Sequence, residues 1–357
     1  MIKQHRIRNS LYVICAALSF YVCPAAASEN TGMESETITD TAMGTDCSVR
    51  VYGSQGTAQK IMDMLSEIEV TYLSWRKEGS DLYTLNQRGA GKDGWKPEQW
   101  TYGYLEKVLE LSEKSGGAFD PTLGAVSALW NLGTDSPYIP KKTEIDKLLE
   151  NTGWENIRME DKTVYLDSGV QLDLGAVGKG IGCDEARKLL EKTDVQAAVV
   201  AVGGSIQLYG EKADQKPWKV GITNPRKEDG EAYLGILTLD GTCSVSTSGD
   251  YEKYVIEDGI RYHHILNPET GYPADSGLIS VTIVSEDGWL GDGLSTACFV
   301  LGYEKSKKLL EEYGAEAVFV TEDKNVLVTD GLKEAFELTD EAYQLKEETN
   351  EREKAAK

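Results

Sequence analysis

One segment near the middle of the chain has the sequence Asp173-Leu174-Gly175-Ala176-Val177-Gly178-Lys179-Gly180. Residues 170–174 predict a strand that runs into this segment, and residues 182–192 after it predict a helix. A glycine-rich turn between a strand and a helix offers backbone N–H groups to a phosphate, and Lys179 adds an ammonium group. The segment is not a P-loop, because that motif has four residues between its first glycine and Gly-Lys, followed by Ser or Thr. A purely structural turn is the alternative.

The sequence on both sides of this segment predicts helices and strands in irregular order. Helical spacing of apolar residues occurs in six further stretches: 57–72, 101–115, 121–132, 143–151, one that starts at residue 292, and 303–313. Strands are predicted at 49–52, 157–159, 164–166, 197–202, 206–209, 219–223, 234–239, 243–247 and 279–284, with further hairpins about 258–259 and 323–325. Strands that do not alternate regularly with helices favour an α+β fold over a doubly wound sheet.

Length and composition are those of a globular protein with an acidic surface. The chain has 357 residues, enough for one large domain or two smaller ones. No repeat or linker divides it, so we expect a flexible leader over 28–40, one domain over 41–340 and a charged tail over 341–357. The net charge of −22 argues against a nucleic-acid partner, since such a surface repels a phosphate backbone. An anionic ligand would therefore need a local lysine, helix N-terminus or metal ion.

The N-terminus has the pattern of a secretory signal peptide. Lys3, Arg6 and Arg8 precede an apolar run over 11–22, and Ala25-Ala26-Ala27 follows. This pattern predicts a signal peptide over 1–27 and an extracytoplasmic protein, at the outer face of the cytoplasmic membrane or in the periplasm. An uncleaved anchor helix is the alternative, and a lipid anchor at Cys23 is a weaker one.

The cysteines do not predict a metal site. Four lie beyond the signal segment, widely spaced and without a C-x-x-C pair, which argues against zinc: Cys47, Cys183, Cys243 and Cys298. Export would permit disulfides among them, but free buried thiols are equally compatible with the spacing.

A second candidate site is the segment Asp292-Gly293-Leu294-Ser295-Thr296. On a helix, Asp292 and Thr296 share one face, because they are four residues apart. Together with Ser295 they would offer the hard oxygen ligands that Mg²⁺ accepts. The alternative is that Asp292 is simply the N-cap of the following helix.

A third candidate is the histidine pair His263-His264, since the remaining histidine, His5, falls in the signal segment. Neighbouring residues in a strand point to opposite faces, so only one of the two should enter a given pocket. An imidazole is suited to proton transfer near neutral pH, and a structurally satisfied histidine is the alternative for each.

Six segments in this order resemble one enzyme family. They are Met43-Gly44-Thr45, Gly117-Ala118-Phe119-Asp120-Pro121-Thr122, the 173–180 segment, Thr247-Ser248-Gly249-Asp250-Tyr251, His264-Ile265-Leu266-Asn267-Pro268, and residues 292–296. Over residues 38–340 the chain resembles the ApbE family, the FAD:protein FMN transferases. The resemblance implies a single large ApbE-like domain of mixed strands and helices after the signal segment.

The resemblance also implies an activity. Such an enzyme uses Mg²⁺ to transfer the FMN moiety of FAD to a Ser or Thr hydroxyl of an acceptor protein, releasing AMP. The acceptor would be a protein with a Ser/Thr flavinylation motif, such as a membrane redox subunit or an FMN-binding domain, which would make the enzyme membrane-associated.

The resemblance assigns roles to individual residues. The metal ligands would be the Ala176 carbonyl, Asp292, Ser295 and Thr296, and His264 would activate the acceptor hydroxyl. FAD would contact Met43, Ala118, Phe119, Asp120, Asp173, Lys179 and Ile265. Two positions depart from the family pattern. Trp75 and Arg76 stand where the family often places a tyrosine over the isoalloxazine ring, and Asn267 stands where many relatives have Asp.

Two other functions would use the same residues. Water could replace the acceptor hydroxyl, which would make the chain an FAD pyrophosphatase that gives FMN and AMP. A non-catalytic exported flavin-binding protein would need the residues that line the FAD site but not Asp292, Thr296 or His264, all of which this chain has.

Overall fold

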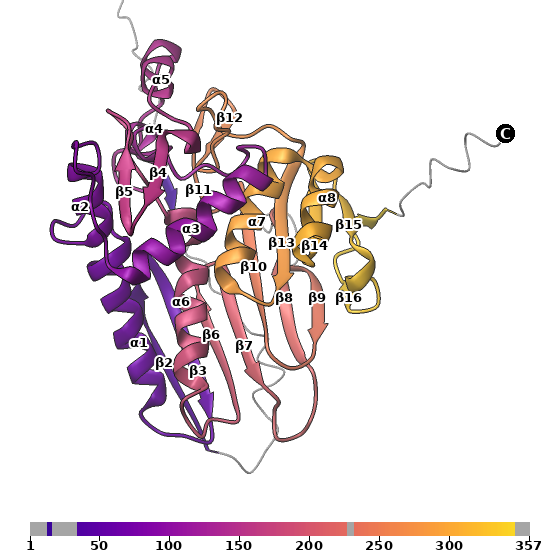
Figure 1. Cartoon of the computed structure of the whole chain (residues 1–357). Coiled ribbons are helices and arrows are strands. Elements are labelled where there is room, and N and C mark those ends of the chain that lie inside the picture. Colours follow the sequence, from indigo (N-terminus) through magenta and orange to yellow (C-terminus); the bar gives the residue numbers. More distant parts are fainter. Residues whose placement is uncertain (1–12, 16–33, 227–231, 347–357) are drawn as a thin grey trace, which may run out of the picture.

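A nine-stranded sheet forms the centre of the molecule, as seen in a computed structural model that describes residues 13–15, 34–226 and 232–346 (Figure 1). The strand order is β17-β15-β14-β13-β10-β7-β6-β3-β2, and all neighbours are antiparallel except β15 and β17. The strands are β2 (Ser35–Ala42), β3 (Thr45–Tyr52), β6 (Ala197–Val202), β7 (Ser205–Gly210), β10 (Cys243–Gly249), β13 (Leu278–Ser285), β14 (Glu316–Thr321), β15 (Asn325–Val328) and β17 (Gln344–Leu345).

Both faces of this sheet are covered, which explains the continuous apolar run of β6. Ala197, Val199 and Ala201 pack in one hydrophobic cluster, and the three residues that alternate with them pack in another. The first cluster includes residues of a small second sheet, made of β8 (Trp218–Thr223), β9 (Tyr233–Leu239) and β16 (Phe336–Leu338). The second includes residues of α1 (Thr57–Ile68) and α6 (Gly175–Leu190). Helices therefore cover one face of the central sheet, and the small sheet covers the other.

Two helices, α6 and α7 (Gly288–Leu301), touch along their backbones. A Cβ atom on Gly180 would lie 2.0 Å from the carbonyl oxygen of Gly288, and one on Gly288 would lie 2.5 Å from that of Gly180. Only glycine permits an approach this close. The glycines that bring the two helices together thus also bring together Lys179 and Asp292, which the two helices carry.

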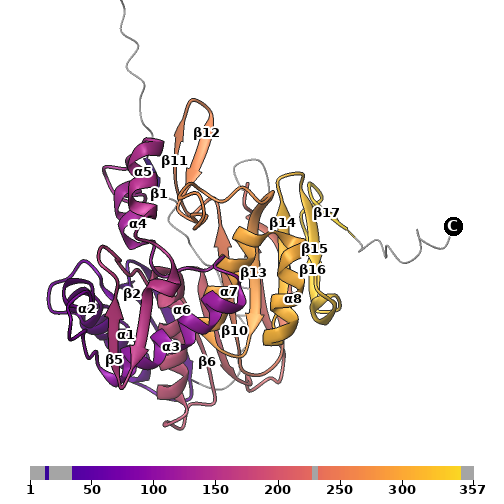
Figure 2. The ribbon, with the colours of Figure 1, turned by 45° about the horizontal axis from the view of Figure 1, so that its top comes forward.

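The remaining elements surround this layer. The helices are α2 (Asp81–Arg88), α3 (Gln99–Lys114), α4 (Gly124–Trp130), α5 (Lys142–Leu149), α8 (Tyr303–Tyr313), the π-helix η2 (Glu69–Leu73) that continues α1, and the 3₁₀ turns η3 (Trp154–Asn156) and η5 (Asp330–Leu332). The remaining strands are the hairpin of β4 (Ile157–Glu160) and β5 (Thr163–Leu166), and a sheet of β1 (Val13–Cys15), β11 (Lys253–Glu257) and β12 (Ile260–His263). Figure 2 shows β11, β12, α4 and α5 projecting together at one end of the molecule.

The α+β prediction is confirmed, and four local predictions are wrong. Residues 170–174 form no strand beyond an isolated bridge between Gln171 and Leu123, and the following helix begins at Gly175 rather than at Gly182. The helix predicted from Asp292 begins four residues earlier, at Gly288. Residues 35–40, predicted to belong to a flexible leader, form most of β2 and pair with β3.

The termini are described only in part. Apart from residues 13–15, the predicted signal peptide over 1–27 lies outside the described residues, as does the predicted tail beyond residue 346. In the described part of the chain, no helix combines the length and the apolar character needed to cross a membrane. The structure has free thiols at Cys47, Cys183, Cys243 and Cys298, in line with the second of the two alternatives for the cysteines.

Candidate active site

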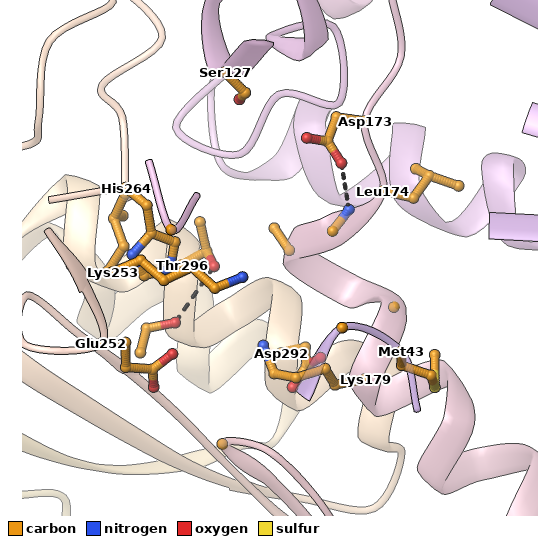
Figure 3. Close-up of a pocket in the computed structure, with 18 of the residues that line it drawn as sticks. Met43, Ser127, Asp173, Leu174, Lys179, Glu252, Lys253, His264, Asp292 and Thr296 are labelled. Carbon is orange, nitrogen blue, oxygen red and sulfur yellow. Dashed lines mark hydrogen bonds between the residues drawn. The ribbon is translucent and has the colours of Figure 1, made fainter. Parts of the chain in front are cut away.

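A cavity of about 610 Å³ lies where α6, α7, the β2–β3 turn and the ends of β10 and β12 meet (Figure 3). All fourteen residues predicted for the site line it, although they come from distant parts of the chain: Met43, Trp75, Arg76, Ala118, Phe119, Asp120, Asp173, Ala176, Lys179, His264, Ile265, Asp292, Ser295 and Thr296. The fold therefore unites every segment that the sequence singled out, and the roles of the individual residues stay predictions.

Asp292 is a buried carboxylate in the wall of this cavity, with 4% of its surface exposed. Its Oδ2 accepts a hydrogen bond of 2.6 Å from the N–H of Gly180, and its Oδ1 accepts one from the hydroxyl of Ser205. It lies in the second turn of α7, so the N-cap interpretation is wrong. The carboxylate of Asp184 instead accepts the N–H groups of Gly288 and Trp289, at 2.7 and 2.9 Å.

Three hydroxyl groups lie beside Asp292. The Ser295 hydroxyl donates to the carbonyl oxygen of Asp292 at 2.8 Å. The Oγ of Ser248 lies 2.7 Å from the Oγ of Ser295 and 3.4 Å from the Oγ1 of Thr296. Ala176, in the first turn of α6, lines the same cavity. One carboxylate and several hydroxyls are thus available to a cation here.

This donor set fits Mg²⁺ better than a metal that needs a complete protein cage. Among the described residues there is no group of three or more His, Cys, Asp or Glu side chains placed to hold a metal ion. Mg²⁺ is usually held by one or two carboxylates and completes its coordination with water and substrate phosphates. The residues present therefore fit a Mg²⁺ ion whose ligands come partly from the protein and partly from the oxygens of a bound diphosphate.

Lys179 supplies positive charge to the cavity. Burial alone would lower the pKa of this ammonium group, but the charges of Asp292 and Glu252 outweigh burial and raise it. Lys179 is therefore charged at neutral pH. It lies in the second turn of α6, not in a glycine-rich turn, so its position is set by the contact between α6 and α7.

A stacked pair of side chains forms the cavity wall near the start of α6. The guanidinium of Arg76 lies 3.7 Å from the ring centre of Trp75. Asp173 accepts the N–H of Gly175 at 2.8 Å; burial raises the pKa of this carboxyl, although Arg76 and Lys253 act in the opposite direction. Trp75 and Arg76 both line the cavity, so the sequence position that departs from the family pattern offers a flat stacked surface in place of a tyrosine.

The 118–120 segment is fixed by hydrogen bonds of its neighbours. Phe119 is 2% exposed and belongs to the main core. Asp120 accepts hydrogen bonds from the N–H and the hydroxyl of Thr122, at 2.8 and 2.6 Å, and burial raises its pKa. Core packing on one side and these hydrogen bonds on the other give the segment one conformation.

Met43 has an unusual backbone conformation. It forms, with Gly44, the two-residue turn between β2 and β3, and both residues have positive φ, 55° and 68°. Hairpin turns of this kind favour Asn, Asp and Gly, because other residues are strained there. The N–H of Met43 donates to the carboxylate of Glu69 at 2.6 Å. Strain of this kind is typical of functional sites.

The two histidines point in opposite directions, as predicted. His264 lines the cavity, whereas His263 lies in the core with its Nε2 3.2 Å from the carbonyl oxygen of Ala274 and its ring against Phe299. Burial, followed by the charges of Lys253 and Lys179, lowers the pKa of His264 well below its usual value. Its Nδ1 has no hydrogen-bond partner in the part of the chain that the structure describes. A neutral imidazole can accept a proton at a ring nitrogen.

Several residues of the cavity wall were missed by the sequence reasoning. Glu252 and Lys253 directly follow the 247–251 segment, and extending that segment by two residues would have found them. Glu69 gave no signal in the sequence, because an acidic residue directly after the apolar pattern of α1 looks like any exposed acidic residue at the end of a helix. Ser127 enters the wall from α4 and was equally unmarked.

Comparisons with known proteins agree with this geometry. The model of the ApbE family matches residues 43–319. The FAD:protein FMN transferase of Treponema pallidum (strain Nichols) is 36% identical over 326 residues, which cover 85% of this chain and 89% of that protein. The FAD:protein FMN transferase of Klebsiella pneumoniae (strain 342) is 30% identical over 308 residues, which cover 85% of this chain and 94% of that protein.

Solved structures show the same likeness. The crystal structure of the ApbE protein of Thermotoga maritima has a TM-score of 0.76 and 33% sequence identity, and covers 85% of this chain and 99% of that one. The apo form of the flavinyl transferase ApbE of Pseudomonas stutzeri has a TM-score of 0.73 and 28% identity, and covers 85% and 97%. The likeness extends over nearly the whole length of each relative.

Proposed function

The chain belongs to the ApbE family, and we propose that it transfers the FMN moiety of FAD to a Ser or Thr hydroxyl of an acceptor protein, with Mg²⁺ as cofactor and AMP as the second product. The observation that carries the proposal is the single cavity that collects Lys179, His264 and Asp292 from separate segments. A cation, an imidazole and a carboxylate surrounded by hydroxyls are the groups that phosphoryl transfer from a diphosphate needs.

The reaction balances without any further reactant. The acceptor hydroxyl oxygen forms a bond to the phosphorus atom of the FMN half of FAD. The bond from that phosphorus to the bridging oxygen of the diphosphate breaks, and AMP leaves with that oxygen. The hydroxyl proton passes to a base of the protein. A phosphoester of FMN on the acceptor side chain and AMP are the products.

The residues of the chain bind the diphosphate and position the reacting groups. Lys179 neutralises part of the diphosphate charge, which this acidic protein would otherwise repel. Asp292, Ser295, Thr296 and the Ala176 carbonyl would hold Mg²⁺, which when bound would supply positive charge to the leaving phosphate. Asp292 keeps its orientation because Gly180 and Ser205 hold both of its oxygens.

His264 is the base in this proposal. Its lowered pKa keeps the imidazole neutral at physiological pH, so it can take the proton of the acceptor hydroxyl. His263 cannot replace it, because its ring lies in the core. We also propose that the protein is exported by its N-terminal segment and works at the outer face of the cytoplasmic membrane or in the periplasm, where it would meet a membrane redox subunit or an FMN-binding domain.

Intact-mass measurement tests the function directly. The protein is incubated with FAD, Mg²⁺ and a purified FMN-binding domain that carries one acceptor threonine. We expect that domain to gain the mass of an FMN phosphoester and AMP to appear in equal amount. AMP and free FMN without a mass gain would instead make the chain an FAD pyrophosphatase.

The metal assignment is tested with Asp292→Ala. Loss of an N-cap alone costs about 0.5–2 kcal/mol of stability and leaves activity intact. Because Asp292 is not the cap, we expect loss of Mg²⁺-dependent turnover out of proportion to any change in melting temperature. Full activity of this variant at limiting Mg²⁺ would remove Asp292 from the metal site.

A further inference from the structure

The hairpin of β11 and β12 begins at the cavity, and a third strand pairs with one edge of it. The sheet order is β1-β11-β12, so β11 lies between the other two strands. Strand β1 pairs antiparallel with β11, and Cys15 lies opposite Lys253 (Figure 2). Lys253 lines the cavity, as does His264 directly after β12. The edge of β11 that β1 occupies therefore ends at the candidate active site.

The hydrogen bonds of β11 show which of its backbone groups face this edge. The carbonyl oxygen of Lys253 accepts the N–H of His264 at 3.0 Å, so Lys253 faces β12. In an antiparallel strand, the backbone groups of successive residues face its two neighbours alternately. Tyr254 and Ile256 therefore direct their N–H and C=O groups to the edge at which β1 lies. These groups can bind an added strand while the pairing with β12 stays intact.

The predicted export would free this edge. Strand β1 consists of residues 13–15 and falls within the signal peptide predicted over 1–27. Of the strands in the described part of the chain, β1 and β12 are the two that pair with β11. Removal of the signal peptide would thus leave backbone groups of β11 without the partner that they have in the structure. A strand edge of this kind is a template for pairing with another chain.

The surface of the hairpin fits an extended segment with apolar side chains. Ile256 and Ile260 are 40% and 55% exposed, whereas most large apolar side chains of the protein are buried. Strand β1 itself has the sequence Val-Ile-Cys, which is apolar and rich in β-branched residues. A partner that takes the place of β1 is therefore expected to be an apolar strand.

The direction of β1 indicates where such a segment continues. Strand β1 begins opposite Val255 and ends opposite Lys253. A segment bound in the same direction would next pass Glu252, which also lines the cavity. Figure 3 shows Glu252 and Lys253 on the same side of the cavity as His264. The residues that follow the paired segment would therefore reach the base.

We propose that the edge of β11 is the docking site for the acceptor protein, which adds an extended apolar segment there, antiparallel to β11. The residue that becomes flavinylated follows this segment in the sequence of the acceptor. The inference rests on the proposed function, because it presupposes an acceptor protein. As long as β1 is present, it competes with the acceptor for the same edge. Backbone hydrogen bonds supply the affinity of strand addition, and the apolar side chains supply its specificity.

Two proline substitutions in the 357-residue chain test the proposal from opposite sides. Ile256→Pro removes an N–H group that faces the edge, and proline is tolerated in strands at such positions. The matched control Ile256→Ala shortens the same side chain but keeps the N–H group. Ile14→Pro removes a donor from β1, because Ile14 lies opposite Tyr254, whose backbone groups face β1.

The probes are FAD, Mg²⁺ and the FMN-binding domain with one acceptor threonine, and the readouts are the KM for that domain, the Kd for FAD and the melting temperature. Loss of one backbone hydrogen bond should raise the KM of Ile256→Pro roughly 3- to 10-fold above that of Ile256→Ala. Ile14→Pro should lower the KM by a similar factor, because it weakens the competing strand. The Kd for FAD should be the same in all three variants, since neither position lines the cavity.

Three results would overturn the proposal while leaving the proposed function intact. One is an unchanged KM in Ile14→Pro, which also decides the matter if Ile256→Pro melts well below the unchanged protein. Another is an equal KM for Ile256→Pro and Ile256→Ala at normal melting temperatures. The third is a dimer of the unchanged protein that Ile256→Pro converts to a monomer, which would assign the edge to a second copy of the chain. If the unchanged protein gives no mass gain on the acceptor domain, the proposed function itself fails, and the docking role of β11 fails with it.

Discussion

Gly180→Ala is the substitution by which the contact between α6 and α7 can be tested most directly. The new Cβ atom would lie 2.0 Å from the carbonyl oxygen of Gly288 and 2.8 Å from the backbone nitrogen of Trp289. Both are backbone atoms and cannot rotate away, so the helices must separate by more than an ångström. Separation also stretches the hydrogen bond from the Gly180 N–H to Asp292. One methyl group should therefore damage both the fold and the site.

The expected loss can be worked out from three contributions. Overpacking costs typically about 1–3 kcal/mol, and weakening a hydrogen bond to a charged group about 1.5–3 kcal/mol. The better helix propensity of alanine returns about 1 kcal/mol. The net loss is about 1.5–5 kcal/mol, which for a domain of this size lowers the melting temperature by roughly 3–15 °C.

Thermal unfolding and Mg²⁺-dependent activity are the assays, and Gly103→Ala is the control. Gly103 lies within α3, and a Cβ atom there would meet nothing within 4 Å. That variant should gain about 0.5–1 kcal/mol and keep full activity. A Gly180→Ala variant that melts within a degree of the unchanged protein would refute the reasoning, because the helices would then be shown to separate at no cost.

Four other predictions follow, three from the site and one from the thiols. Lys179→Ala should weaken FAD binding in a titration without changing the melting temperature, because it removes a positive charge from the cavity. An unchanged affinity for FAD would show that the role of this lysine is structural. His264→Asn should keep FAD binding while transfer falls roughly 10²–10⁴-fold, with a far smaller effect of His263→Asn. Because the pKa of His264 is lowered, its imidazole stays neutral as the pH falls through 6.5. The transfer rate of the wild-type protein should therefore stay level from pH 8 to below 6.5 and decline only in more acidic buffer. A decline centred above pH 6.5 would contradict this prediction. Burial raises the pKa of four thiols, to about 11 for Cys47 and Cys243, to about 12 for Cys298, and well above the usual value for Cys183. At pH 8 a thiol reagent should therefore label these four positions slowly in the native protein and readily in the denatured chain. Rapid labelling of any of these four positions in the native protein would show that its thiol is accessible and ionised.

Elements whose pattern reflects a simple environment could be predicted from the sequence. The helix α8 was predicted with the bounds Tyr303–Tyr313 that the structure has, because one of its faces is apolar and the other charged. The strand β6 was predicted as Ala197–Val202, because both of its faces are buried and every residue is apolar.

Elements whose pattern reflects tertiary contacts could not be predicted. Gly175, Gly178 and Gly180 were interpreted as a turn, because the low helix propensity of glycine is visible in a sequence and a partner helix is not. The strand β2 was missed because it is a polar edge strand, whose residues are set by its pairing with β3. Within the site, a family pattern located fourteen residues. Glu69 could not be predicted in this way, because its place in the site follows from the hydrogen bond that it accepts from the backbone N–H of Met43.

The left-handed turn at Met43 has a consequence for attempts to improve this protein. A residue with a side chain in this conformation typically costs about 1–3 kcal/mol, which Gly or Asn would recover in part. A selection for heat resistance alone would therefore enrich replacements at position 43, and each would remove the thioether from the cavity wall. Thermal tolerance and substrate recognition compete at this one hairpin, so a directed-evolution campaign would have to select for both at once.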